Sequence, residues 1–128
     1  MAKIGEFENM KLIHVYQLHS TADKIDEDAF CDAFRGKNVM KAWLKNLYEH
    51  RASVIVQDLE EAFEIGNMRH EDLTWQHPQC YSFSVGNIFH NVDDDVMYIC
   101  EPVGWSKIKM SHAMLSVISK EYFTDSSC

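Results

Sequence analysis

The sequence lacks any long apolar run, and this absence limits where the protein is expected to work. No stretch of its 128 residues approaches the roughly 18–20 consecutive apolar residues of a membrane span. The first ten residues, MAKIGEFENM, also lack the apolar segment of a secretory signal. We therefore expect a cytoplasmic protein with no membrane partner, in which the cysteines stay free thiols. Of these, Cys31 and Cys100 fall in apolar patterns and are predicted to be small core residues.

An excess of basic residues is missing as well. The net charge is −8, and it is spread evenly, because residues 1–64 hold 12 acids and 8 bases while residues 65–128 hold 8 acids and 4 bases. A protein that binds the phosphate backbone needs a basic face. The composition therefore argues against direct nucleic-acid binding.

Motifs for catalysis and metal binding are also absent. There is no glycine-rich phosphate loop and no Gly-x-Ser-x-Gly elbow. His77 and Cys80 have the spacing of a zinc-binding pair, but no second close pair completes a four-ligand set. We predict no catalytic residue, metal or cofactor. One alternative stays open, a small thiol enzyme that uses Cys80 with His77 and Asp72.

The first half of the chain predicts one strand and two helices. Residues 11–18 alternate and are rich in β-branched and aromatic side chains, which favours a strand. Asp26 is a good cap for a helix that ends near Gly36. Asn38 is a good cap for a second helix over residues 39–50, whose apolar residues keep helical spacing. That spacing is set by Val39, Met40, Trp43, Leu44, Leu47 and Tyr48.

The second half predicts a strand, a helix and a hairpin. Residues 53–57 are interpreted as a strand, with a continuous helix as the alternative. A short helix follows over residues 58–67, with Asp58 as its cap, Glu61 completing a capping box and Gly66 at its end. Gly86 and Asn87 indicate a turn or bulge, and residues 87–91 and 96–101 then predict an antiparallel hairpin around an acidic turn in water. A short strand after Gly104 and a last helix capped by Ser111 complete the set.

These elements predict a single α+β domain over residues 1–128. We expect a small antiparallel sheet with a C-terminal β-hairpin, packed by three to four helices.

Residues 53–108 resemble the C-terminal half of the small YodL-like domains of phages, plasmids and other mobile elements. Both have a short helix, a Ser-Val-Gly-Asp/Asn strand entry and a hairpin that ends in an aromatic residue after glycine. The sequence departs from that pattern twice, because Asn87 replaces the usual Asp and the predicted helix over residues 39–50 has no counterpart. The matching residues are Leu59, Phe63, Asn67, Ser84, Val85, Gly86, Asn87, Ile88, Tyr98, Gly104, Trp105 and Ile108.

The resemblance implies an accessory protein that acts on host machinery or host defence and has no catalytic residue. We therefore expect a non-enzymatic interaction protein that binds and inhibits a host protein. The alternative is an acidic immunity protein or antitoxin that neutralises a basic nuclease. The sequence leaves self-association into homo-oligomers open. Aromatic, methionine and histidine side chains are good interface anchors, and the predicted partner-binding residues are Met68, His70, Trp75, His77, Tyr81 and Trp105.

Overall fold

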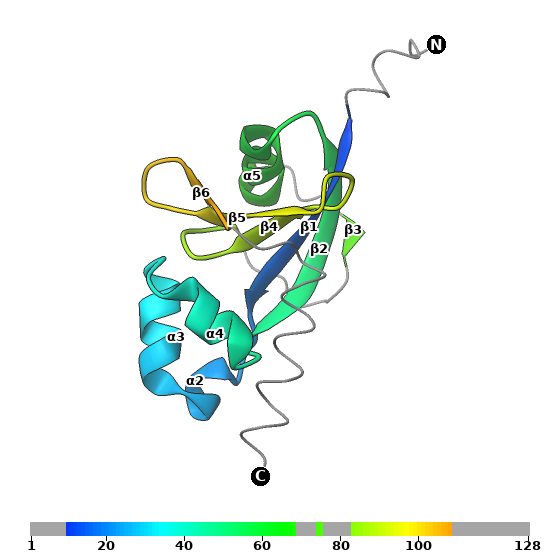
Figure 1. Ribbon diagram of the computed structural model, residues 1–128. Helices are drawn as coiled ribbons and strands as arrows, with labels where there is room; N and C mark the ends of the chain where they lie inside the picture. Colours follow the sequence, from blue (N-terminus) through cyan, green and yellow to red (C-terminus); the bar gives the residue numbers. More distant parts are fainter. Residues whose placement is uncertain (1–9, 69–73, 76–82, 109–128) are drawn as a thin grey trace, which may run out of the picture.

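The structure, a computed structural model, describes residues 10–68, 74–75 and 83–108. Within these residues six strands form one antiparallel sheet in the order β3-β2-β1-β4-β5-β6. Four helices pack around the sheet (Figure 1). The predicted α+β class is confirmed, together with the antiparallel sheet, the hairpin and the packing of helices on the sheet.

The sheet is centred on the strand that the sequence predicts first. The strand β1 pairs with β2 on one side and with β4 on the other. The preference for a strand over residues 53–57 is confirmed, and so is the hairpin of β4 and β5. The strands are β1 (Lys11–Leu18), β2 (Tyr48–Val56), β3 (Thr74–Trp75), β4 (Ile88–Asn91), β5 (Val96–Cys100) and β6 (Trp105–Lys107).

The helices are α2 (Ala22–Ile25), α3 (Glu27–Phe34), α4 (Val39–Leu44) and α5 (Leu59–Met68). Asp26 caps α3, because its Oδ1 accepts a hydrogen bond from the backbone N–H of Ala29 at 2.9 Å. Asp58 caps α5 in the same way through the N–H of Glu61 at 2.8 Å. The Glu61 carboxylate accepts from the N–H of Gln57 at 3.3 Å, so the capping box closes one residue earlier than its usual form.

The predicted helix over residues 39–50 is wrong in its second half. The helix α4 ends at Leu44, and β2 begins at Tyr48. Asn46 adopts a φ of +62°. The backbone N–H of Leu47 donates to the carbonyl of Ala42 at 3.0 Å, and the backbone N–H of Asn46 donates to the carbonyl of Trp43 at 2.9 Å. This is the Schellman ending of a helix with asparagine in the left-handed position. The apolar stripe misled the prediction because Leu47 and Tyr48 are buried in the same core as α4, but from the turn and the strand.

Two cap predictions also need correction. Asn38 has a φ of +49° and makes no cap hydrogen bond; instead its amide donates to Asp32 Oδ2 at 3.1 Å. Gly66 does not end α5, which continues to Met68. A Cβ atom at Gly66 would lie 2.1 Å from Cδ2 of Phe83. The glycine is therefore needed for close packing rather than for helix termination.

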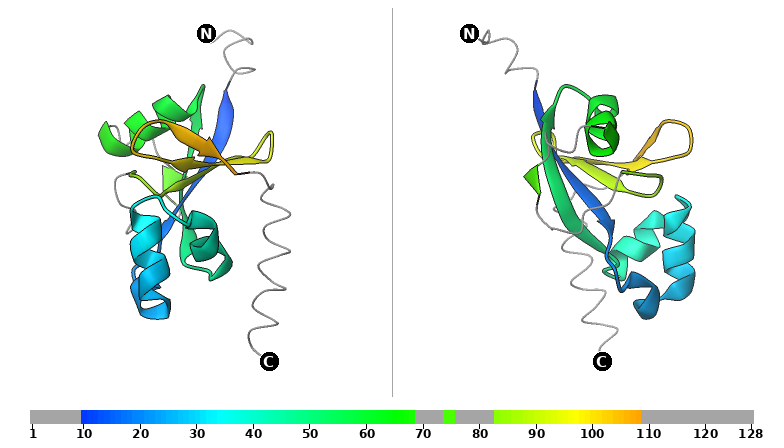
Figure 2. Two further views of the ribbon diagram at one scale, coloured as in Figure 1. Left: turned by 60° about the vertical axis from the view of Figure 1, so that its left-hand side comes forward. Right: turned by 180° about the vertical axis from the view of Figure 1, so that it is seen from behind.

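Two groups of buried side chains cover opposite faces of the sheet. One packs beneath α5 and contains Val15, Val54, Ile65 and Phe89, among others. The other packs against α3 and α4. In both views of Figure 2, α5 lies at one end of the sheet and α2, α3 and α4 gather at the end where β1 stops and β2 starts. Because strand side chains alternate, β1 contributes to both groups.

The acidic turn between β4 and β5 is exposed to solvent, and each of its aspartates also makes hydrogen bonds to neighbouring residues. Asp93 and Asp94 are exposed, as predicted for a solvated turn. Even so, the carboxylate of Asp93 accepts a hydrogen bond from the backbone N–H of Leu12 at 3.1 Å. The carboxylate of Asp94 accepts from the side-chain amide of Asn91, whose oxygen accepts from the backbone N–H of Asp94. The carboxylate of Asp95 contacts Nε2 of His90 at 2.8 Å. The three carboxylates therefore point to three different partners.

Of the two cysteines predicted to be core residues, Cys100 is buried, but Cys31 is exposed on α3. The buried positions of α3 are occupied by Ala29 and Ala33 instead. None of the helices in the described part of the chain is long and apolar enough to cross a membrane. Ser111 and its predicted helix lie outside the described residues.

Candidate functional site: the Trp105 groove

The β5–β6 hairpin sets the position of Trp105. The chain turns at Glu101, whose N–H bonds the carbonyl of Gly104 at 3.1 Å. Gly104 has a φ of +80°, which other residues rarely adopt. The turn places Trp105 opposite Cys100 in the ladder. Trp105 therefore lies on the same face of the sheet as α5.

The indole of Trp105 is held by two aromatic rings and one carboxylate. Its ring centroid lies 4.8 Å from that of Phe89 and 6.3 Å from that of Phe63, both in edge-to-face arrangements. Its Nε1–H donates to Oε1 of Glu60 at 3.0 Å. Glu60 lies in the first turn of α5, where the helix dipole favours a negative charge. The contact thus joins the last strand to the start of α5 across the edge of the core.

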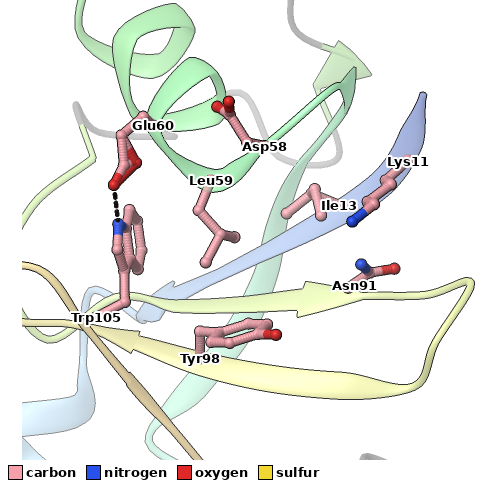
Figure 3. Close-up of a pocket in the computed structure, with 8 residues that line it drawn as sticks. All are labelled: Lys11, Ile13, Asp58, Leu59, Glu60, Asn91, Tyr98 and Trp105. Atoms are coloured by element: carbon pink, nitrogen blue, oxygen red, sulfur yellow. Dashed lines mark hydrogen bonds between the residues drawn. The ribbon is translucent and has the colours of Figure 1, made fainter. Parts of the chain in front are cut away.

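A groove of about 370 Å³ opens beside this pair (Figure 3). Its lining comes from β1, the start of α5, β4, β5 and β6: Lys11, Ile13, Asp58, Leu59, Glu60, Asn91, Tyr98 and Trp105. A second cavity of about 240 Å³ is also lined by Glu60 and Trp105, and it adds Phe63, Cys100, Glu101, Pro102 and Gly104. The Trp105–Glu60 pair therefore contributes to the walls of both cavities, which we call together the Trp105 groove.

The groove combines aromatic surface with negative charge. The indole of Trp105 and the ring of Tyr98 line it beside the carboxylates of Asp58 and Glu60. Among the described residues that line it, Lys11 is the one basic residue. Burial and the nearby carboxylates of Glu60 and Glu101 raise the pKa of the Cys100 thiol. The thiol is therefore protonated at neutral pH and is a poor nucleophile. These groups fit a binding surface for a cationic ligand better than a site of covalent chemistry.

The structure describes two of the six predicted partner-binding residues only through their backbone. Met68 is the last residue of α5. Trp75 pairs with Ala52 in β3, at the opposite edge of the sheet from β6. Five strand spacings separate these edges, roughly 24 Å. Trp105 and Trp75 therefore do not belong to one compact patch.

The other predicted residues, His70, His77 and Tyr81, lie outside the described residues, as do Cys80 and Asp72. The thiol-enzyme alternative therefore stays a prediction. Within the part of the chain that is described, no group of three or more histidine, cysteine or carboxylate side chains could hold a metal ion.

Sequence reasoning missed most of the groove. Asp58 was identified as a cap, but nothing in the sequence relates Glu60 to Trp105, which are 45 residues apart. Tyr98 follows the strand alternation that puts it on the face of Trp105. That alternation is a usable signal only once the order of the strands is known.

Comparisons with protein-family models, with curated proteins and with solved structures found no match to the chain. The resemblance to YodL-like domains therefore stays a prediction.

Proposed function

We propose that this chain is a non-enzymatic protein-binding domain, carried by a phage or other mobile element, that binds and blocks a host protein through the Trp105 groove. The observation that carries the proposal is the Trp105–Glu60 pair, which presents aromatic surface and a carboxylate to two adjoining cavities. The mobile-element origin and the host target rest on the YodL-like resemblance.

The partner should present a basic side chain to this groove. A lysine or arginine that enters it would meet the carboxylates of Asp58 and Glu60. Its alkyl stem would lie along Tyr98 and Trp105, whose ring faces attract cations. The net charge of −8 adds long-range attraction for a basic surface and speeds the encounter.

The experiment compares two charge-neutralising variants of the same helix. Glu60→Gln removes a charge from the groove but keeps an oxygen that accepts the Trp105 hydrogen bond. Glu64→Gln removes the same charge from an exposed residue of α5 that lines neither cavity. Each purified chain is used to capture partners from bacterial lysate, and the affinity of the captured protein is then measured at low and high salt.

We expect one stoichiometric partner whose binding is weakened several-fold by Glu60→Gln and little by Glu64→Gln. Equal losses in both variants would mean that only net charge matters, and the groove would no longer be the binding site. Capture of no partner, together with turnover of a substrate by the purified chain, would contradict the protein-binding function itself.

An acidic immunity protein or antitoxin that neutralises a basic nuclease is the second candidate. The net charge of −8 favours it. The two candidates differ in their salt response, because binding that depends mainly on charge weakens steeply with salt. Inhibition of nuclease activity by the purified chain, lost at high salt, would support this candidate.

A further inference from the structure

A second pocket, of about 270 Å³, lies between α3 and the end of β1, away from the Trp105 groove. Phe30 and Phe34 of α3 form one wall with their rings stacked at 6.0 Å. The rest of the described lining consists of Leu18, Val85, the buried carboxamides of Gln17 and Asn87, and the polar residues His19, Ser20 and Ser84. No lysine, arginine or carboxylate is among the described residues that line it. We call this the Asn87 pocket.

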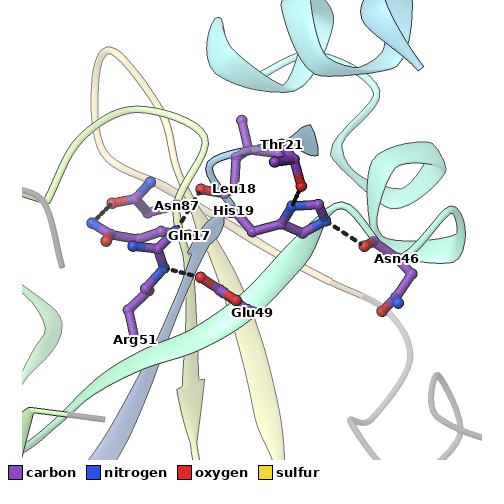
Figure 4. Close-up of polar contacts among 8 residues, drawn as sticks. All are labelled: Gln17, Leu18, His19, Thr21, Asn46, Glu49, Arg51 and Asn87. Atoms are coloured by element: carbon purple, nitrogen blue, oxygen red, sulfur yellow. Dashed lines mark hydrogen bonds and ion pairs between the residues drawn. The ribbon is translucent and has the colours of Figure 1, made fainter. Parts of the chain in front are cut away.

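The carboxamide of Asn87 has a fixed orientation. Its Oδ1 accepts from the backbone N–H of Ser84 at 2.9 Å and from Nε2 of Gln17 at 3.1 Å. Because a backbone N–H can only donate, the Asn87 side-chain atom that faces the N–H of Ser84 must be the oxygen. The second terminal atom of the Asn87 carboxamide is therefore the nitrogen Nδ2, and Figure 4 shows it turned away from Gln17.

The Asn87 nitrogen Nδ2 is a donor that lacks an acceptor among the described residues but keeps some contact with solvent. Asn87 is 7% exposed, and its Nδ2 donates no hydrogen bond within the described part of the chain. Water can satisfy such an N–H group until a ligand oxygen takes its place. An N–H group that lines a pocket and lacks an acceptor is suited to a ligand that brings an oxygen.

The wall that carries Asn87 is held in place before any ligand binds. The N–H of Gly86 donates to the carbonyl of Cys100 at 2.8 Å, and the hydroxyl of Tyr48 donates to the carbonyl of Gly86 at 2.6 Å. A Cβ atom at Gly86 would lie 2.0 Å from the carbonyl oxygen of Ala33. This contact sets α3 tightly against the loop, so the pocket does not need to form on binding.

Size and exposure indicate what the pocket takes. Its volume of about 270 Å³ is below the roughly 300–1,000 Å³ of small-molecule sites and suits a single side chain. Phe34 at its rim is 65% exposed, so part of its ring surface is open to an occupant of the pocket. The aromatic wall of Phe30 and Phe34 favours an apolar occupant, and Asn87 favours one that also brings an oxygen.

We propose that the Asn87 pocket binds an aromatic side chain of a partner protein, whose backbone carbonyl accepts a hydrogen bond from Asn87 Nδ2. The occupant is a protein segment, so the inference rests on the proposed protein-binding function. The pocket shares no lining residue with the Trp105 groove, so each surface can fail its test without the other.

The test is an NMR titration of the ¹⁵N-labelled full chain with N-acetyl-phenylalanine methylamide. This probe carries an aromatic ring between two amide carbonyls. N-acetyl-alanine methylamide, which has the same carbonyls without the ring, is the control ligand. We expect saturable shifts of the Asn87 side-chain NH₂ signals and of the Phe34 and Val85 amides with the phenylalanine probe alone.

Two variants test the two halves of the proposal. Asn87→Asp keeps the oxygen that Ser84 and Gln17 require but replaces the donor by a charged oxygen. Affinity should therefore fall by at least the roughly two- to tenfold of one lost neutral hydrogen bond, because the new oxygen also repels the partner's carbonyl. Phe34→Ala removes exposed wall and should weaken binding at least as much. Ile25→Ala is the matched control, because Ile25 is 56% exposed on α2 and lies outside the pocket.

Several results would overturn the proposal. One is no shift of the Asn87 side chain up to the solubility limit of the probe. Another is equal shifts with the alanine control, and a third is unchanged affinity in Asn87→Asp. Backbone spectra of each variant in the absence of probe separate loss of binding from loss of fold.

Discussion

Replacing Gly66 by alanine sets two effects of opposite sign against each other. Alanine is favoured over glycine within a helix by about 1 kcal/mol, so the change alone would stabilise α5. However, the added Cβ would lie 2.1–2.4 Å from three ring atoms of Phe83. Phe83 is 2% exposed and packs edge-to-face on Phe89 at 5.3 Å, so its ring has little room to move.

Overpacking of a tight core costs about 1–3 kcal/mol, and contacts this short place the cost at the upper end. The net expectation is a loss of about 1–2 kcal/mol in the free energy of unfolding. Urea denaturation at equilibrium measures it, with an unchanged m-value as the sign that the unfolded state is unaffected. The control variant is Glu64→Ala, which places alanine at an exposed position of the same helix and so reports the effect of helix propensity without a packing contact.

A double-mutant cycle with Phe83→Leu identifies the cause. Leucine removes the ring that the new methyl group meets, so the two changes together should destabilise less than the sum of the single changes. A Gly66→Ala variant that is more stable than the original chain would refute the reasoning, because helix propensity would then outweigh the contact.

Three further outcomes follow from polar groups of the fold. Asp58→Ala should lower the free energy of unfolding by about 1 kcal/mol through loss of the α5 cap, whereas Asp58→Asn should lower it far less; urea denaturation compares them. Tyr48→Phe should cost about 1 kcal/mol, because the carbonyl of Gly86 loses its buried donor; thermal unfolding measures it, and an unchanged melting temperature would contradict the contact. Burial, together with nearby His90, lowers the pKa of His50 against the opposing hydrogen bond to Ala52. The unfolded chain therefore takes up this proton first as the pH falls below about 6.5, and stability falls with it. In His50→Gln the decline between about pH 7 and 5 should be shallower, and an identical decline would exclude His50 as its source.

How far the sequence predicts this fold depends on how local each signal is. The caps at Asp26 and Asp58, the alternation of β1 and the hairpin of β4 and β5 are set within a few residues, and all were predicted. The helix over residues 39–50 failed because hydrophobic periodicity records burial and not the path of the chain. Asn46 was a usable signal, since asparagine is the residue after glycine that most readily takes the left-handed position at a helix end.

The candidate sites depend on contacts that are distant in sequence. Trp105 was predicted as a binding residue, but its partner Glu60 could be found only from the order of the strands. For the Asn87 pocket the missing information was different in kind. The sequence indicated a turn at Gly86 and Asn87, but which atom of the Asn87 amide lacks a partner depends on Ser84 and Gln17. Gln17 is 70 residues away.

The strand β1 relates the two surfaces to each other. Lys11 and Ile13 line the Trp105 groove, and Gln17 and Leu18 line the Asn87 pocket. At about 3.4 Å per residue, Ile13 and Gln17 are roughly 14 Å apart along the strand. Changes at sites this far apart with no shared contacts usually add in free energy. Glu60→Gln and Asn87→Asp should therefore weaken a partner that occupies both sites by independent factors that multiply. Factors that fail to multiply would mean that the sheet transmits a change from one site to the other, whereas a partner that occupies one site alone would respond to only one of the two variants.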